Sequence, residues 1–276
     1  MPLAPATTLS NRSKSLIMDG TCLFLGTGAS SGIPVIGCHC PICSSRAVHN
    51  RRLRSSVLIR INQKVLLIDS GPDFRQQALI HKIDRLDALL LTHTHYDHIA
   101  GIDELRAYYF RDKWPVPCLL SQESFQELES RYDYLFERRE DSTKTAQFKF
   151  QILENDFGST AIADIPVDYF SYSQCNMKVT GFRFGNFAYV TDIREYGHEI
   201  FAALSGVQKL VVGAISKAKS HAHFTVDEAV EFALKVGAHH TWLTHIAHHL
   251  DHDATEQLLP PEIRLGYDGL EIEFRI

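Results

Sequence analysis

The stretch His93-Thr94-His95-Tyr96-Asp97-His98 brings three imidazoles and a carboxylate together within six residues. It directly follows the apolar run 88–91, which is typical of a buried strand. A strand that ends in such a cluster carries polar groups to the rim of a sheet, where loops bear the chemistry. Histidine is the commonest metal ligand near neutral pH, and a neighbouring carboxylate favours a dication. The stretch therefore predicts a metal centre at the end of a strand.

The composition is that of an ordinary globular protein. Hydrophobic residues make up 45% and charged residues 22% of the 276 residues. No run of about 18 apolar residues occurs, so no membrane partner is expected. The formal charge of −5 argues against a nucleic-acid partner bound through bulk electrostatics. The oligomeric state stays open, a homodimer being the commonest form.

The N-terminal segment, residues 1–19, is polar and lacks the apolar core of a secretory signal. We expect it to be a disordered lead-in to a single domain over residues 20–276. Three of the six cysteines, Cys38, Cys40 and Cys43, lie close together in the sequence. Such crowding is more typical of a metal site in a reducing cytoplasm than of a disulfide framework. The expected localisation is therefore cytoplasmic.

Hydrophobic patterns predict one α/β domain with strands in two sheets. A hairpin is expected over residues 56–61 and 65–69, with further strands at 86–92 and 116–120. Alternation assigns four more strands to a second sheet, at residues 148–153, 160–169, 178–184 and 187–191. The last expected strands lie at residues 209–212, 240–244, 262–265 and 270–274.

Helices are expected between these strands. One begins near Asp97 and has an apolar face formed by Ile99, Ile102, Leu105 and Tyr109. Others are expected at residues 121–137 and 193–204. Another starts at a capping box formed by Thr225 and Glu228 and ends at Gly237.

Two further polar groups stand at predicted strand ends, Thr191-Asp192 and Thr244-His245. The order of these motifs after the His93–His98 stretch resembles the metallo-β-lactamase fold superfamily, over residues 21–276. The resemblance implies an αββα sandwich of two mixed β-sheets flanked by helices, with a dinuclear site at one edge. In such a site two dications need a shared anion between them.

The resemblance also implies a role for each motif residue. His93 and His95 would hold one metal, and Asp97, His98 and His245 the other. Asp192 would bridge the two. Asp69 stands where the family keeps a carboxylate that orients a ligand histidine, a contact that raises metal affinity.

Five motifs narrow the resemblance to the phosphoribosyl cyclic phosphate phosphodiesterase group of phosphonate breakdown, which is related to tRNA 3′-processing endonucleases. They are Gly26-Thr27-Gly28, residues 37–43, Asp69-Ser70-Gly71, residues 244–248 and Gly266-Tyr267-Asp268-Gly269. The first has the wrong spacing for a nucleotide loop and is either a tight turn or a part that shapes the site. By this resemblance Cys38, Cys40, Cys43 and His248 hold a structural zinc, and such a closed tetrahedral set leaves no position for water.

The same group places a histidine near the substrate phosphate, as general acid or phosphate ligand. Its counterpart is His223, which stands at the start of the capped helix, with His221 as the alternative. The candidate catalytic residues are therefore Asp97 and His223.

One family feature is missing. The family has another metal-ligating histidine in the segment 168–177, which contains none in this chain. By spacing back from Gly181, Gln174 is nearest to that position, and Cys175 and Asp168 are the other candidates. A glutamine is a weak neutral ligand, so the first metal should bind less tightly than with an imidazole. Three outcomes stay open: an altered metal preference, a metal bound with the help of the substrate, or impaired catalysis.

The resemblance implies a metal-dependent phosphodiesterase that hydrolyses a small cyclic phosphate or nucleotide-like diester through a metal-bound hydroxide. The expected cofactors are two divalent metals, Zn or Mn, or only one of them, together with the structural Zn. The expected partner is a small phosphate-ester substrate. Two alternatives remain: a non-hydrolytic or degenerate metal-binding member of the fold, as in quinone-cofactor biosynthesis, and a tRNA 3′-processing-like nuclease. The number of bound metals separates the first alternative from the phosphodiesterase.

Overall fold

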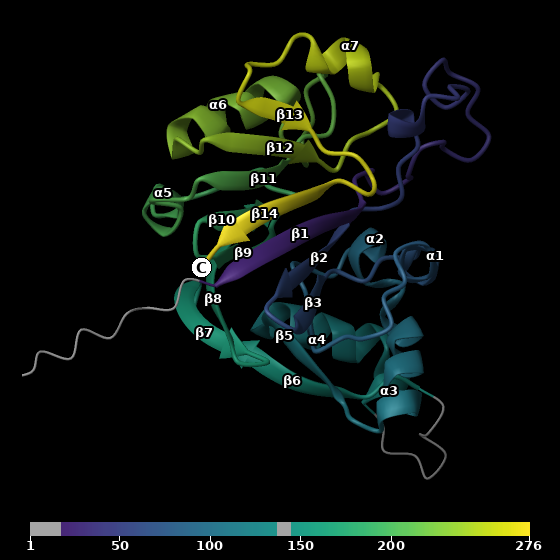
Figure 1. Cartoon of the computed structure of the whole chain (residues 1–276), viewed down its shortest axis with the longest axis vertical. Helices are drawn as coiled ribbons and strands as arrows, with labels where there is room; N and C mark the ends of the chain where they lie inside the picture. The colour runs from purple at the N-terminus through teal and green to yellow at the C-terminus, as the bar shows by residue number, and fades with distance from the viewer. Residues whose placement is uncertain (1–17, 137–144) are drawn as a thin grey trace, which may run out of the picture.

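The computed structural model describes residues 18–136 and 145–276 of the chain (Figure 1). Residues 1–17 of the lead-in expected over 1–19 lie outside the described residues, whereas Asp19 already begins a strand, so the expected end of the lead-in was wrong. The described strands form two seven-stranded sheets. Among the described residues, no helix has both the length and the apolar character needed to cross a membrane.

The first sheet runs in the order β14-β1-β2-β3-β4-β5-β6. Its strands are β1 (Asp19–Gly26), β2 (Ser56–Ile61), β3 (Lys64–Ile68), β4 (Ala88–Leu90), β5 (Val116–Ser121), β6 (Phe148–Leu153) and β14 (Glu271–Arg275). The predicted hairpin of β2 and β3 is confirmed, and β3 to β6 are parallel neighbours.

The second sheet runs in the order β13-β12-β11-β10-β9-β8-β7. Its strands are β7 (Phe157–Ile162), β8 (Ile165–Gln174), β9 (Met177–Phe184), β10 (Phe187–Val190), β11 (Lys209–Gly213), β12 (His240–Thr244) and β13 (Ile263–Leu265). The strands from β7 to β10 are antiparallel neighbours, whereas those from β10 to β13 are parallel.

Two strand predictions were wrong. Strand β6 pairs with β5 and so belongs to the first sheet, because alternation reports a half-buried strand but not its partner. The single strand expected over 160–169 is a hairpin of β7 and β8. Its turn residues, Ala163 and Asp164, both have positive φ, 50° and 68°, without a glycine to signal the turn.

Helices cover the outer face of each sheet, so the predicted αββα sandwich is confirmed (Figure 1). The first sheet packs against α1 (Phe74–Ile80), α3 (Arg106–Asp112) and α4 (Gln122–Arg131). The second sheet packs against α5 (Ile200–Ala203) and α6 (Val226–Val236). A third apolar cluster fills the space between the sheets, and both sheets contribute to it, for example through Phe24 and Phe182.

The capping box of α6 is confirmed, with Thr225 and Glu228 bonded reciprocally and Gly237 at φ 74°. The prediction of one long helix from Asp97 to Tyr109 was wrong. The chain instead forms α2 (Tyr96–Ile99), the 3₁₀ turn η2 (Ile102–Leu105) and α3. The interruption is tertiary: Gly101 N–H donates to the carbonyl oxygen of Ser70 at 2.8 Å, outside any helical ladder.

The helix expected over residues 193–204 is also shorter, since only α5 forms. The backbone N–H groups of Arg194 and Glu195 donate to the carbonyl oxygen of Ser173 instead of continuing a helix. Helix α4 ends at Arg131, before the expected end at 137, which lies outside the described residues. The short helix α7 (His252–Glu256) was not expected.

Candidate metal centre

Polar residues from both sheets meet at one edge of the sandwich. Asp69 follows β3, the His93–His98 stretch follows β4, Asp192 follows β10 and His245 follows β12. Asp69, Asp192 and His245 have φ of 63°, 53° and 59°. This left-handed region is strained for residues with a Cβ, and such strain persists where the surroundings over-determine the backbone, as at metal and catalytic sites.

We define the His98 half of the centre as Asp97, His98 and His245. The Nε2 atom of His245 lies 3.2 Å from Asp97 Oδ2 and 3.3 Å from Asp192 Oδ1. The Nε2 atom of His98 lies 3.4 Å from Asp97 Oδ2 and 3.2 Å from Asp192 Oδ2. Two imidazole nitrogens and two carboxylates thus face a common point.

We define the His93 half as His93, His95 and Gln174. His93 Nε2 and His95 Nδ1 lie 3.0 Å apart. Candidate ligand atoms of these two histidines and of Asp192 all lie within 4.8 Å of one another. Asp192 therefore stands between the two halves, where a shared anion would have to be.

Asp69 supports histidines of both halves. Its Oδ2 accepts a hydrogen bond from His98 Nδ1 at 2.7 Å. The same oxygen accepts from the Thr92 hydroxyl at 2.8 Å, and the Thr92 oxygen in turn lies 2.9 Å from His93 Nδ1. With Nδ1 of each ring occupied in this way, Nε2 is the nitrogen left to bind a metal.

Burial and charge act against each other here. Burial would lower the pKa of His98, but the carboxylates of Asp192, Asp97 and Asp69 together raise it well above the usual value. Burial would raise the pKa of Asp192, yet His245 and His98 hold it well below the usual value. The two histidines thus hold the Asp192 carboxylate in its ionised form, and the carboxylates favour the protonated form of His98.

The donor set fits divalent metals. His98 Nε2 is fully buried and has no hydrogen-bond partner with acceptable geometry, although it lies within 3.4 Å of two carboxylates. A nitrogen and oxygens that point at one spot without bonding to each other match the ligands of one cation better than a hydrogen-bond network. Mixed imidazole and carboxylate donors suit several divalent metals.

Of the three candidates for the missing ligand, Gln174 lies at the centre and the other two do not. It is the last residue of β8, in what was predicted to be a loop, and its Nε2 donates to Asp192 Oδ1 at 3.0 Å. Its buried Oε1 has no hydrogen-bond partner. Asp168 bonds to Ser159 at the surface, and the Cys175 thiol faces the carbonyl oxygen of His221.

His223 rather than His221 lies at the centre. Its Nδ1 is 3.4 Å from Asp192 Oδ1, and Gln174 Nε2 lies 3.1 Å from it. Burial, together with the nearby His245, lowers the pKa of His223 to about 4, so its ring is neutral at neutral pH. His221 is exposed.

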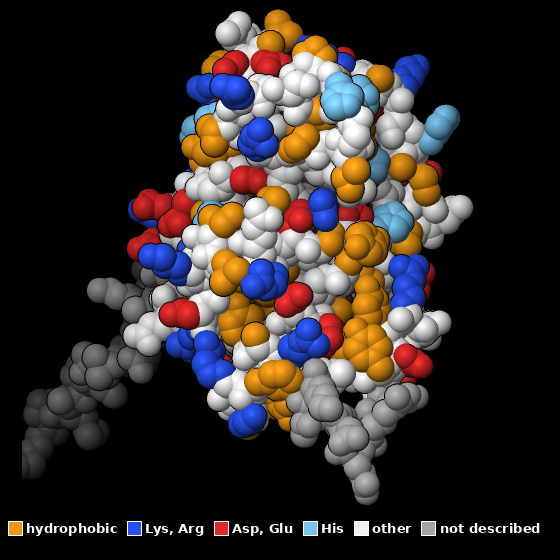
Figure 2. Space-filling model, turned by 90° about the vertical axis from the view of Figure 1, so that its right-hand side faces the viewer, with side chains coloured by type: hydrophobic (Ala, Val, Ile, Leu, Met, Phe, Trp, Pro, Cys, Tyr) orange, Lys and Arg blue, Asp and Glu red, His pale blue; other side chains and the backbone are white. Residues whose placement is uncertain are grey.

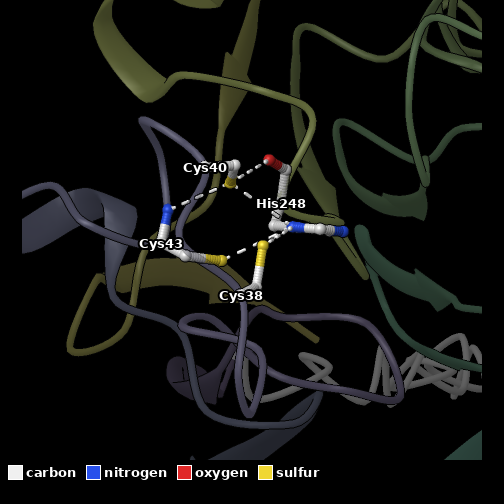
Figure 3. Close-up of side chains that lie close together, drawn as sticks. All are labelled: Cys38, Cys40, Cys43 and His248. Carbon is white, nitrogen blue, oxygen red and sulfur yellow. Dashed lines mark hydrogen bonds between the residues drawn. The ribbon is translucent and has the colours of Figure 1, made fainter.

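Cys38, Cys40, Cys43 and His248 form a second cluster, which shares no residue with the two halves (Figure 3). The sulfur atoms of Cys38, Cys40 and Cys43 lie 3.4, 3.5 and 3.4 Å from His248 Nδ1. Zinc bonds of about 2.3 Å to sulfur and 2.0–2.1 Å to nitrogen at tetrahedral angles would separate sulfur and nitrogen by roughly 3.6 Å. The N–H of Cys43 lowers the pKa of Cys40 to about 6, which favours the thiolate that a metal requires.

The two glycine motifs pack behind His245. The Thr27 hydroxyl donates to Asp268 Oδ1 at 2.7 Å, and the Ile246 N–H donates to Thr27 O at 2.9 Å. Arg52, fully buried, donates to Thr27 Oγ1 at 2.7 Å and to Gly266 O at 2.5 Å. The Gly26-Thr27-Gly28 turn thus bonds to the backbone of the residue that follows His245. Sequence reasoning missed Arg52 and Thr92, since neither belongs to a local pattern.

Comparisons with known proteins agree with this fold. The family model described as "Beta-lactamase superfamily domain" matches residues 64–246. The chain is 35% identical over 253 residues to an octanoyltransferase of Porphyromonas gingivalis, covering 91% of the chain and 51% of that protein. It is 34% identical over 98 residues to coenzyme PQQ synthesis protein B of Methylobacterium nodulans, covering 30% of the chain and 33% of that protein. The chain therefore spans about half or less of these relatives' lengths.

Solved structures resemble the whole chain. A crystal structure described as a new diphosphatase from the PhnP family has 33% identity and a TM-score of 0.86, covering 95% of the chain and 99% of that protein. Zn²⁺-bound PqqB from Methylobacterium extorquens has 18% identity and a TM-score of 0.73, covering 91% and 99%. The short form of human tRNase Z has 19% identity and a TM-score of 0.67, covering 91% and 98%. Because these two identities are below 25%, the likeness of the chain to PqqB and to tRNase Z shows a common fold only.

Proposed function

Since the chain belongs to the β-lactamase superfamily and, within it, to the PhnP family, we propose that it is a metal-dependent phosphodiesterase. Its substrate would be a small cyclic phosphate or a nucleotide-like diester. The observation that carries the proposal is the position of Asp192 between two sets of imidazoles, with each set supported by Asp69.

The proposal gives each residue a task. Asp97, His98 and His245 would hold one divalent ion, His93 and His95 the other, and Asp192 both. When bound, two such ions supply a nucleophile at neutral pH and offset the charge of the phosphoryl oxygens. Gln174 completes the His93 half with an amide, and we propose that its Oε1 turns towards an ion there, because this oxygen is buried without another partner.

His223 would act on the substrate. It lies beside Asp192 with 14% of its side chain exposed, so it borders the centre without being closed off from it. Its neutral ring can donate one N–H to a phosphoryl oxygen, and a bound phosphate anion would favour its protonation. We propose that His223 binds the phosphate and passes a proton to the leaving oxygen.

A small substrate fits the surface better than a long nucleic acid. On the face that Figure 2 presents, acidic and basic side chains are interspersed and several histidines gather in the upper part. A groove that binds a nucleic-acid backbone is instead lined by a continuous band of basic side chains. The diphosphatase relative is likewise described as acting on a phosphate compound.

The cluster of Cys38, Cys40, Cys43 and His248 is proposed to hold a structural zinc. The free state of the described cysteines and this thiolate set also support a reducing, cytoplasmic location. Replacing Cys40 with Ala should remove one tightly bound zinc and lower the Tm together. If zinc content and Tm both stayed unchanged, the structural zinc would have to be abandoned.

A non-hydrolytic metal-binding role is the second candidate, favoured by the amide of Gln174 where the family has an imidazole and by the likeness to coenzyme PQQ synthesis proteins. Acyl transfer, the activity named for the octanoyltransferase relative, is not proposed for this chain. The octanoyltransferase is about twice as long as the matched region, and the described imidazoles and carboxylates converge on each other, not on a nucleophilic side chain.

The test is hydrolysis of bis-p-nitrophenyl phosphate by the full chain with added Mn²⁺, Zn²⁺, Ni²⁺ or Fe²⁺. We expect turnover well above that of a His98→Ala variant with at least one metal. Rates equal to this control with every metal would overturn the proposal. Metal content measured on the same preparation separates the candidates, since one structural zinc alone supports the non-hydrolytic role.

A further inference from the structure

We infer that Glu127 and Arg131 of α4 are positioning residues for His93 and His95, and that they determine how tightly this half of the centre binds a metal. They do so by holding Thr94, the residue between the two histidines. The inference rests on the proposed two-metal function and adds residues from a helix that contributes no ligand to the centre.

The contacts form a closed bracket. The Thr94 hydroxyl donates to Glu127 Oε2, and Arg131 Nη1 donates to the Thr94 carbonyl oxygen at 2.6 Å. Arg131 Nη2 also bonds to Glu127 Oε2 at 3.0 Å, as expected for residues one helical turn apart. One side-chain pair therefore binds both the side chain and the carbonyl group of Thr94.

This carbonyl belongs to the peptide that joins Thr94 to His95, so Arg131 restrains the backbone from which the His95 ring projects. The ring needs that restraint. Among the described residues, its one hydrogen-bond contact is with His93, at 3.0 Å. Unlike His98, it has no carboxylate behind it, and the orientation of a ligand imidazole strongly affects metal affinity.

The bracket can serve orientation because its contribution to stability is small. Arg131 and Glu127 have 46% and 43% of their side chains exposed, and such surface ion pairs contribute little to folding. Thr94, in contrast, is 2% exposed. The contacts thus reach from the surface to a buried residue between two ligands. Their loss should change the His93 half more than the fold.

Helix α6 offers a matched control. Lys235 and Glu231 form an ion pair at 2.8 Å with the same i,i+4 spacing, and their side chains are 52% and 67% exposed. Neither bonds to a residue of the centre. Removing this pair reproduces the loss of a helical surface ion pair without touching Thr94.

The experiment is a Co²⁺ titration of the full chain that carries its tightly bound zinc, followed by isothermal calorimetry and by the d–d absorption of Co²⁺. Wild type should show two classes of site, and a His95→Ala variant identifies the class that belongs to the His93 half. Arg131→Ala should weaken that class roughly 10- to 100-fold and alter its d–d spectrum, while the other class stays unchanged. Lys235→Ala should match wild type in both classes, and Arg131→Lys should recover part of the affinity.

Equal affinities and spectra for Arg131→Ala and wild type would overturn the inference. If Arg131→Ala does not fold, the Thr94→Val variant tests the inference instead, because it keeps the shape of the side chain but removes the hydroxyl donor. If the affinity of the site class assigned to the His93 half is unchanged in that variant, the inference is also overturned. A wild type that binds no Co²⁺ beyond the zinc cluster would instead contradict the proposed function, so the two failures are distinguishable.

Discussion

His98 and His95 lie in the same short stretch, yet their rings are held in different ways. The Nδ1 atom of His98 bonds to Asp69 at 2.7 Å, and its Nε2 faces the carboxylates of Asp97 and Asp192. Among the described residues, His93 is the one hydrogen-bond partner of the His95 ring. Residues three apart in the sequence therefore receive support from different elements, His98 from the end of β3 and His95 through Thr94 from α4.

The two halves also differ in their donors. The His98 half has two imidazoles and a carboxylate of its own, whereas the His93 half has two imidazoles and an amide. An amide oxygen is a weaker ligand than an imidazole for most first-row dications. We expect the first metal to enter the His98 half and the second to bind the His93 half more weakly. Asp192 faces both halves, so a substitution at this residue should affect both of them at once.

Replacing Asp192 with Asn should have the largest effect, since it removes the charge that both halves share. We expect loss of metal from both halves and a fall in kcat for bis-p-nitrophenyl phosphate on the order of 10³-fold, because a bridging anion contributes several kcal/mol to holding two dications. Metal analysis and steady-state kinetics measure both. A His95→Ala variant serves as the control, which should lose only the weaker metal. Retention of both metals by Asp192→Asn would contradict a bridging role.

The strand-end motifs predicted much of this centre. Asp69, the His93–His98 stretch, Asp192 and His245 follow strands whose ends meet at one edge, and parallel strands bring such ends together. Spacing also pointed to Gln174, which does lie beside Asp192. The bracket of Glu127 and Arg131 could not be predicted, because it joins residues more than thirty apart through tertiary packing alone.

The fold itself shows the same division between local and tertiary information. The capping box of Thr225 and Glu228 was predictable because every contact in it lies within one helical turn. The break after α2 was not, since it follows from the contact of Gly101 with Ser70. The sheet to which β6 belongs was also beyond a periodicity argument, which reports burial but no partner.

Changing Gln174 to His should reduce the difference between the halves. An added imidazole gives the His93 half a third strong nitrogen donor, and we expect its Zn²⁺ affinity to rise roughly 10- to 100-fold with little change in the His98 half. Calorimetric titration resolves the two. Gln174→Ala is the matched control and should weaken the His93 half. If the histidine variant binds no more tightly than the alanine variant, Gln174 does not contribute a ligand position.

Asp69 and Thr92 allow the support of the halves to be separated. Asp69→Asn removes the carboxylate behind His98 and, through Thr92, behind His93, so both metals should bind roughly 10-fold or more weakly. Thr92→Val removes the contact with His93 and the hydroxyl's hydrogen bond to Asp69, but it keeps the bond of Asp69 to His98. Its effect should therefore be smaller and fall mainly on the His93 half. The measurement is again titration with Co²⁺. Equal losses in both halves for Thr92→Val would show that the hydrogen-bond chain is not how the support reaches His93.

The smallest expected effect concerns protons. Carboxylates raise the pKa of His98 well above its usual value despite burial, whereas burial lowers the pKa of His93 and of His95. The pKa of His245, in the same half, is raised as well despite its burial, by Asp192 and Asp97. A metal entering the His98 half must therefore displace protons at neutral pH, and its affinity should rise with pH, by at most about tenfold per unit for each proton displaced. The His93 half holds no such proton, so its affinity should stay nearly constant above pH 6.5. Titrations between pH 6.5 and 8, with proton release followed by the buffer dependence of the calorimetric heat, would reveal the difference. Parallel pH dependences in the two halves would mean that the carboxylates around His98 do not set its protonation, and the electrostatic contrast between the halves would then fail.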